Sequence, residues 1–329
     1  MGQSYRCRVR RAVLLRGVGA DIHSTSSWMV RGAAEGKFFH FKGEVATMDL
    51  ALVTRIVELA DERFPVVDVG AGPPVLLLHG FPDSRFLWRH QVPVLSKAGY
   101  RVIAPDLRGL GDAPRPTADR AYRRPCLIAD VLRLLDRLEL DRVHLVGHDW
   151  GAALSWRIAG SYPDRVDRLV VLSVGAPTSP GWETIAQREK SWYFDFFCKP
   201  DIAEAALAAD DWTLFREWSR GQGDQERYLK DLARPGALTA ALNWYRGAFM
   251  PLEPGEPPLP ALPAGDKVKS RTLGVWSDGD PFLLEPQIAM SAAAVDAPWR
   301  YERVSGAGHW LMLDQPAALN RLLLQFLRG

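Results

Sequence analysis

The feature that most constrains this chain is the pentapeptide Gly147-His148-Asp149-Trp150-Gly151. An apolar run, Val143-His144-Leu145-Val146, precedes it, and a helix-like segment, residues 152–160, follows at once. Two glycines around one polar residue between a strand and a helix predict a nucleophile elbow, a turn so tight that its central side chain is exposed at the strand tip. Aspartate occupies that centre, where serine is the better-known residue. We therefore expect Asp149 to be a nucleophile.

The elements around this motif predict an α/β fold. Strands alternate with helices over residues 53–173 and again over residues 272–327, which is typical of a mostly parallel, doubly wound sheet. Residues 178–265 break the rhythm, because they are rich in aromatic side chains, read as several helices and end in a proline-dense linker. We therefore predict a core domain formed by residues 48–177 and 266–329, with an inserted helical cap, or lid, at residues 178–265.

Residues 1–47 form a basic N-terminal extension. They carry eight Lys or Arg and three Asp or Glu, a net charge of +5, which leaves about −3 for the remainder of a chain whose net charge is +2. The main body therefore shows no basic footprint for nucleic acid. We expect the extension to be a disordered tail or the product of too early a start codon, with Met48 as the natural start.

The composition also excludes several classes of protein. Cys7, Cys126 and Cys198 are far apart and odd in number, which argues against a disulfide framework and a zinc site. No apolar run approaches the ~20 residues that a membrane span needs. We expect a cytoplasmic protein with no metal, no cofactor and no nucleic-acid partner, and the sequence leaves a homodimer open.

Three polar residues follow three different strands of the predicted sheet. Asp149 follows one strand, Asp280 follows the first strand after the insertion, and His309 follows the last strand. Sites in doubly wound sheets lie beyond the carboxyl ends of the strands, and the order nucleophile, acid, histidine is that of the α/β-hydrolase triad. Asp278 stands two residues before Asp280, so the pattern leaves open which carboxylate pairs with His309.

The loop His79-Gly80-Phe81-Pro82 follows another strand. The backbone N–H groups of Phe81 and of Trp150, the residue after the nucleophile, are expected to form an oxyanion hole. Gly80 permits a close approach of the chain, and His79 is interpreted as a structural loop residue.

An aspartate nucleophile determines the chemistry. A carboxylate with a reference pKa near ~3.9 is already ionised at neutral pH, so it can attack a saturated carbon and form an ester of the enzyme. His309, oriented by Asp280, would then activate water to hydrolyse that ester. The substrate is therefore expected to carry an epoxide or a carbon–halogen bond.

The cap supplies candidates for the proton that an opening epoxide needs. Tyr193 and Tyr245 carry phenols that can donate a proton to the ring oxygen, whereas a departing halide needs only weak N–H donors. Aromatic side chains near the two tyrosines and near His309 are the predicted substrate-pocket residues: Trp192, Phe197, Trp244 and Trp310.

Taken together, these motifs resemble those of the α/β-hydrolase-fold epoxide hydrolases, and the resemblance covers roughly residues 52–327. The segment Leu242-Asn243-Trp244-Tyr245-Arg246 is similar to the lid motif that bears one ring-opening tyrosine, and Tyr193 falls where the other is expected. The resemblance implies a small-molecule epoxide and water as the partners in the reaction. The loop at residues 107–113 follows the family pattern only loosely.

Two alternatives remain at this stage. Haloalkane and haloacetate dehalogenases also use an aspartate elbow, and Trp150 would suit halide binding. Haloalkane dehalogenases often carry Asn where Phe81 stands, and haloacetate enzymes typically carry Arg at the position of Trp150, so the sequence favours epoxide hydrolysis. A catalytically silent ligand-binding protein usually lacks a triad member, and none is missing here.

Overall fold

The computed structural model describes residues 27–31, 38–42, 53–250 and 267–329, which fall in two compact units. In the first unit, β1 (Ser27–Arg31) and β2 (Phe38–Lys42) form an antiparallel pair that the sequence analysis did not predict. The rest of the N-terminal extension and the predicted proline-dense linker at residues 251–263 lie outside the described residues.

The second unit contains an eight-stranded sheet with the order β10-β9-β8-β7-β5-β6-β4-β3. Its strands are β3 (Thr54–Leu59), β4 (Glu62–Val69), β5 (Pro74–Leu78), β6 (Arg101–Pro105), β7 (Val143–His148), β8 (Val166–Leu172), β9 (Arg271–Ser277) and β10 (Trp299–Val304). Neighbouring strands in the stretch β10-β9-β8-β7-β5-β6 pair in parallel. β4 pairs antiparallel with both β6 and β3. The predicted mostly parallel sheet is confirmed. Because β5 lies between β6 and β7, the winding direction reverses at β5, which is where ligands bind in such sheets.

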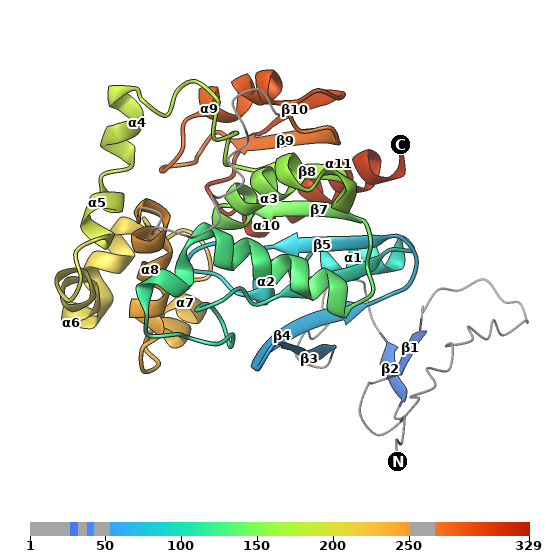
Figure 1. Ribbon diagram of the computed structural model, residues 1–329, viewed down its shortest axis with the longest axis horizontal. Coiled ribbons are helices and arrows are strands. Elements are labelled where there is room, and N and C mark those ends of the chain that lie inside the picture. Colours follow the sequence, from blue (N-terminus) through green and yellow to red (C-terminus); the bar gives the residue numbers. More distant parts are fainter. Residues whose placement is uncertain (1–26, 32–37, 43–52, 251–266) are drawn as a thin grey trace, which may run out of the picture. The chain divides into compact units, whose positions relative to one another are not determined.

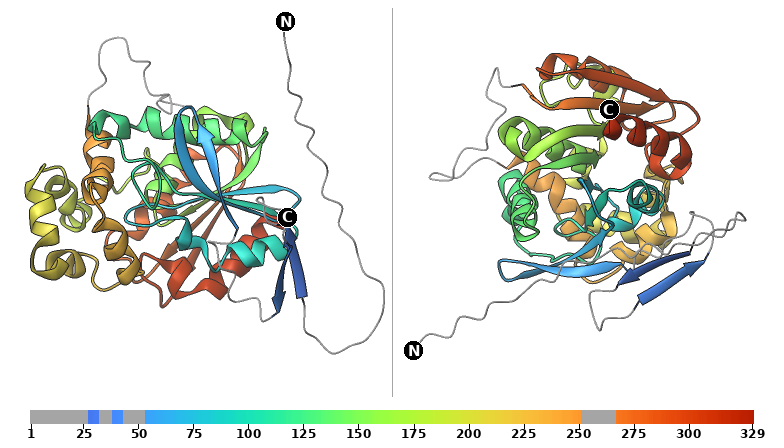
Figure 2. Two further views of the ribbon diagram at one scale, coloured as in Figure 1. Left: turned by 90° about the horizontal axis from the view of Figure 1, so that it is seen from below. Right: turned by 90° about the vertical axis from the view of Figure 1, so that its right-hand side faces the viewer.

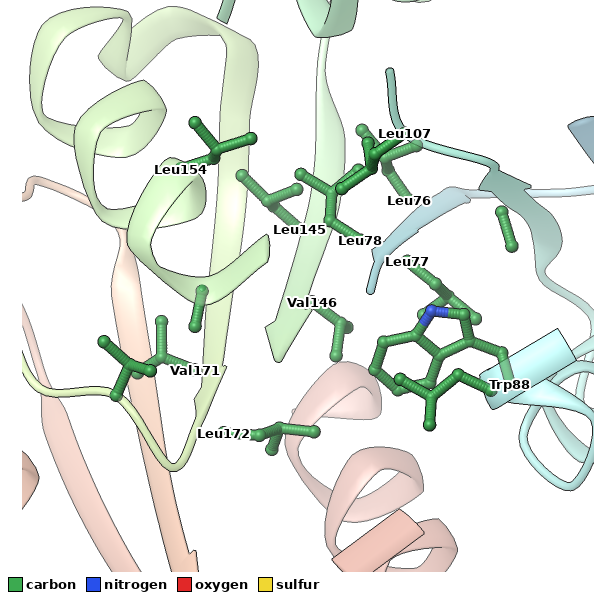
Figure 3. Packing of buried hydrophobic residues seen from close by; sticks show 14 of the residues in the cluster. Leu76, Leu77, Leu78, Trp88, Leu107, Leu145, Val146, Leu154, Val171 and Leu172 are labelled. Carbon is green, nitrogen blue, oxygen red and sulfur yellow. The ribbon is translucent and has the colours of Figure 1, made fainter. Parts of the chain in front are cut away.

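The central strands are apolar along their whole length because both faces of the sheet are covered. Leu76 and Leu77 of β5 are opposite Leu145 and Val146 of β7, and all four are almost fully buried. Alternate side chains point to opposite faces (Figure 3), so Leu145 packs on the side of Leu154 and Val146 on the other side.

Helices lie on both faces of the twisted sheet (Figure 2). In Figure 1, α2 and α3 cross in front of the strands, and α1 and α11 cover the opposite face. The bounds of the core helices are α1 (Val92–Lys97), α2 (Arg124–Arg137), α3 (Trp150–Ser161), α9 (Glu285–Ala289), α10 (Leu311–Asp314) and α11 (Pro316–Arg328).

A helical insertion between β8 and β9 lies beyond one end of the strands (Figure 1). Its helices are α4 (Ile185–Lys190), α5 (Tyr193–Phe197), α6 (Ile202–Trp218), α7 (Gln225–Leu232) and α8 (Ala237–Phe249). The predicted cap boundary at 178 falls between β8 and α4, and the boundary at 265 lies outside the described residues. The insertion is tied to the core by buried hydrogen bonds, such as that from Trp244 Nε1 to Arg108 O at 2.8 Å.

Truncation of Leu77 to alanine tests the importance of the central strands. Leu77 has no exposed surface, so Leu77→Ala loses the transfer free energy of the removed atoms and leaves a cavity. We expect the free energy of unfolding to fall by about 2–5 kcal/mol in chemical denaturation. Ile185→Ala is the control, because Ile185 is 77% exposed and its loss is expected to cost less than about 0.5 kcal/mol. Equal losses from the two variants would contradict this account.

Candidate active site

Asp149 sits in a strained turn between β7 and α3. Its backbone angles, φ 53° and ψ −123°, lie in a region that L-residues rarely adopt, at a cost on the order of 1–3 kcal/mol. Its glycine neighbours make the turn sterically feasible. A Cβ on Gly151 would lie 2.2 Å from Leu78 O, and a Cβ on Gly147 would lie 2.4 Å from Gly151 O. The predicted elbow is therefore present, and its two glycines are required by close approach.

The loop after β5 supplies a backbone donor to the Asp149 carboxylate. The Phe81 N–H donates to Asp149 Oδ1 at 2.8 Å. A Cβ on Gly80 would lie 2.2 Å from the same oxygen, so only glycine permits this approach. The backbone N–H of Trp150 also hydrogen-bonds the carboxylate and lowers its pKa. Both predicted oxyanion-hole donors thus lie beside Asp149.

His309 lies between two carboxylates. Its Nδ1 is 2.8 Å from Asp280 Oδ2, and its Nε2 is 3.6 Å from Asp149 Oδ2. Asp280 is held in place because its Oδ1 accepts hydrogen bonds from the N–H groups of Phe282 at 2.8 Å and Leu283 at 3.0 Å. Asp278 is exposed and accepts from the Gly306 N–H instead. Asp280 is therefore the carboxylate that faces His309.

Asp149 and His309 shift each other's pKa values. Burial alone would raise the pKa of Asp149, but the hydrogen bond and charge of His309 outweigh it, so the pKa is lowered. Burial alone would lower the pKa of His309, but the charge of Asp280 and the hydrogen bond to Asp149 raise it to about 10. At neutral pH Asp149 is therefore a carboxylate and His309 an imidazolium.

Tyr193 and Tyr245 come from α5 and α8 and are both buried. Their ring centroids are 6.0 Å apart, and the Tyr245 ring is 5.2 Å from that of Trp150 and 5.3 Å from that of Phe81. Burial raises the pKa of both phenols well above the ordinary value, and the charge of Asp149 raises it further. Both hydroxyls therefore remain protonated at neutral pH.

A cavity of about 290 Å³ opens beside Asp149, Trp150 and Tyr193. Its other walls are Arg124, Ala153, Arg157, Val174, Gly175, Pro177, Trp182, Phe194 and Leu283. The sequence analysis missed the two arginines, Trp182 and Phe194. Helical spacing could have identified Arg157, which lies four residues after Ala153 on α3.

The four predicted pocket residues do not line this cavity. Trp192 is half exposed and lines a second hollow of about 680 Å³ on the other side of Tyr193. Phe197 is buried against Phe81, with ring centroids 5.6 Å apart. The indoles of Trp244 and Trp310 are engaged with Arg108 O and Asp83 Oδ2. Phe197, Trp244 and Trp310 are thus engaged in packing or hydrogen bonds, and Trp192 lines the other hollow.

Comparison with known proteins assigns the chain to a family. Residues 73–316 match the family model described as alpha/beta hydrolase fold. Epoxide hydrolase A of Mycobacterium tuberculosis is 33% identical over 84% of this chain and 97% of its own, and human Epoxide hydrolase 4 is 35% identical over 81% and 76%. The chain belongs to the epoxide hydrolase family of the α/β-hydrolase fold. The crystal structure of Epoxide Hydrolase A from Mycobacterium thermoresistibile aligns with this hydrolase at a TM-score of 0.70 and 31% identity, over 84% of this chain and 98% of the other.

Two further histidines lie near the site of this epoxide hydrolase family member. His79 Nε2 accepts a hydrogen bond from the Leu107 N–H at 3.0 Å, and burial lowers the pKa of His79 to about 4. His148 Nε2 lies 3.0 Å from His309 O, and burial lowers its pKa to about 3. Both are neutral at neutral pH and hold the loops that carry Phe81 and His309.

Within the described part of the chain, no three His, Cys, Asp or Glu residues gather as metal ligands would, and Cys198 is a free thiol. None of the helices in those same ranges is long and apolar enough to cross a membrane. The predicted cytoplasmic location and the open question of a homodimer stay predictions.

Replacement of each nearby aspartate tests the electrostatics of His309. Asp280→Asn removes the charge that raises the pKa of His309, so that pKa should fall toward its ordinary value in an NMR titration of the ring protons. Asp278→Asn is the matched control and should leave the pKa of His309 unchanged, because Asp278 is exposed and bonds the Gly306 N–H. A fall of the same size in both variants would contradict the assignment of Asp280.

Proposed function

We propose that this hydrolase opens epoxides to vicinal diols through an alkyl ester on Asp149. The observation that carries the proposal is the pair of buried, protonated phenols, Tyr193 and Tyr245, packed beside an ionised nucleophile. Similarity to proteins named epoxide hydrolase supports it. A departing halide has no need for two such acids, so the phenols favour an epoxide over a carbon–halogen bond.

In the first step, Asp149 attacks an epoxide carbon. Oδ2 is the attacking atom, because Oδ1 accepts the Phe81 N–H. The carbon–oxygen bond of the ring breaks, its electron pair passes to the ring oxygen, and that oxygen takes a proton from Tyr193 or Tyr245. General acid catalysis of this kind contributes roughly 10²–10⁴-fold.

In the second step, His309 activates water. Formation of the ester removes the negative charge of Asp149, one of the two groups that raise the pKa of His309. The imidazolium can then release its proton, which restores the phenol that protonated the ring oxygen. The neutral imidazole accepts one proton from the water that attacks Cγ of Asp149, and the second proton of that water passes to the departing alkoxide oxygen. Negative charge develops on Oδ1, where the N–H groups of Phe81 and Trp150 stabilise it. Collapse releases the diol and leaves an oxygen atom from water in the carboxylate.

Replacement of His309 should trap the ester. In His309→Gln the first step proceeds, and the second step loses its base and slows by roughly 10²–10⁴-fold. We expect a mass increment equal to that of the epoxide on the Asp149 peptide after incubation with styrene oxide. The variant Asp149→Asn is the control and should show no adduct.

Product analysis of the wild-type protein decides between the candidate reactions. Styrene oxide should yield the diol, and a single turnover in ¹⁸O-labelled water should put the label into Asp149 rather than into the diol. Bromide release from 1-bromobutane without diol from styrene oxide would contradict the proposal and favour a dehalogenase. Saturable binding without product would indicate a silent ligand-binding protein.

Removal of the two phenols tests the acids. The double variant Tyr193→Phe, Tyr245→Phe should slow alkylation by styrene oxide by roughly 10²–10⁴-fold, measured in single turnovers, because the leaving alkoxide has no donor. Tyr162→Phe is the control, since Tyr162 follows α3 away from the cavity wall. Full turnover by the double variant would show that neither tyrosine is the acid.

A further inference from the structure

Two arginines line the cavity that holds the nucleophile. Arg124 is the first residue of α2, and Arg157 belongs to α3. Both are half-buried, and α2 and α3 pack side by side (Figure 1). Arg157 lies seven residues after Trp150, so the two share one face of α3 about 10 Å apart along its axis. Both cationic side chains therefore line the same cavity as Asp149.

Neither guanidinium has a hydrogen bond or an ion pair with any part of the chain that the structure describes. Other shielded arginines of this protein are neutralised: Arg85 pairs with Asp106, Arg108 with Asp130, and Arg246 with Glu204. A partly desolvated charge without a partner is costly, so its persistence requires an explanation.

The surroundings of the two guanidinium groups destabilise their positive charge. Burial and, to a smaller extent, the charge of Arg124 lower the pKa of Arg157 to about 10, and both side chains line the one cavity. Arg124 also stands in the first turn of α2, where the helix dipole disfavours a cation and favours an anion. Both effects would be relieved by an anionic group bound between the two side chains.

We propose that Arg124 and Arg157 form an anion subsite that binds a carboxylate or phosphate group of the substrate while the epoxide carbon meets Asp149. The inference rests on the proposed function, because it assigns the substrate class of the same cavity. Guanidinium groups bind both anions in a bidentate manner. Asp149 lines the same cavity and is ionised at neutral pH, so repulsion between the two anions favours a substrate that carries its anion several carbon atoms from the ring.

The test compares unbranched terminal epoxides that carry a carboxylate, a phosphate monoester or a hydroxyl at the far end, in several chain lengths. The wild-type protein should prefer an anionic epoxide to the matched alcohol by roughly 10- to 100-fold in kcat/KM, as expected for one or two charge-assisted hydrogen bonds. The carboxylate and phosphate series identify which anion the subsite takes.

Substitution of each arginine gives the residue-level test. Arg124→Gln and Arg157→Gln should each lower kcat/KM for the anionic epoxide by roughly tenfold or more, mainly through KM, and lower it much less for the alcohol. Arg157→Glu should reverse the preference toward an epoxide with a terminal amine. Arg137→Gln is the matched control, because Arg137 is exposed on α2, the helix of Arg124, and does not line the cavity. This variant should behave as wild type.

Two outcomes separate failure of the subsite from failure of the proposed function. Diol formation with equal kcat/KM for anionic and neutral epoxides would overturn the subsite alone.

Absence of diol from every epoxide would overturn the proposed function. Calorimetry with decanoate and decyl phosphate would still test the subsite in that case. Binding that is lost in Arg157→Gln supports the subsite, and equal binding or no binding in both proteins overturns it. A lower melting temperature of Arg157→Gln with an unchanged anion preference would also overturn it.

Discussion

The close approach between the elbow and the loop after β5 is the constraint on which the site depends. Gly151 lies so near the carbonyl oxygen of Leu78, and Gly80 so near Asp149 Oδ1, that no side chain fits at either glycine. This contact brings the Phe81 N–H within 2.8 Å of the carboxylate. The strain in the Asp149 backbone is sustained by the surrounding sheet, because β5 and β7 are paired and fully covered by side chains.

The electrostatics of His309 follow from the same arrangement. Parallel strands end at one edge of the sheet, so segments far apart in the sequence place Asp149, Asp280 and His309 together. A cation between two anions is stable at neutral pH, and it becomes a base only when one anion is removed. Formation of an ester on Asp149 would do this. The site would thereby couple the protonation state of His309 to the progress of the reaction without any movement of the backbone.

The sequence predicted the sheet, the cap and the residues that meet at the strand ends, because chain order and glycine spacing directly constrain backbone geometry. It did not distinguish Asp280 from Asp278, since both follow β9 in one turn and only the Phe282 and Leu283 N–H groups fix which one turns inward. The sequence also did not identify which aromatic side chains line the cavity. Whether Phe194 or Phe197 of α5 faces the cavity depends on how the cap packs against the core, which no local pattern encodes.

The wall of the cavity carries both an anion and cations, and α3 contributes to both. The Asp149 carboxylate at the start of α3 is the anion, and the guanidinium of Arg157, two turns later in the helix, is a cation. A neutral epoxide would gain nothing from this polarity, whereas an epoxide with a distant anionic group can align in only one direction. Directional binding would also select which ring carbon meets Asp149, since the oxygen must lie toward Tyr193 and Tyr245. The proposed anion subsite would thus connect substrate class and regiochemistry through a single electrostatic cause.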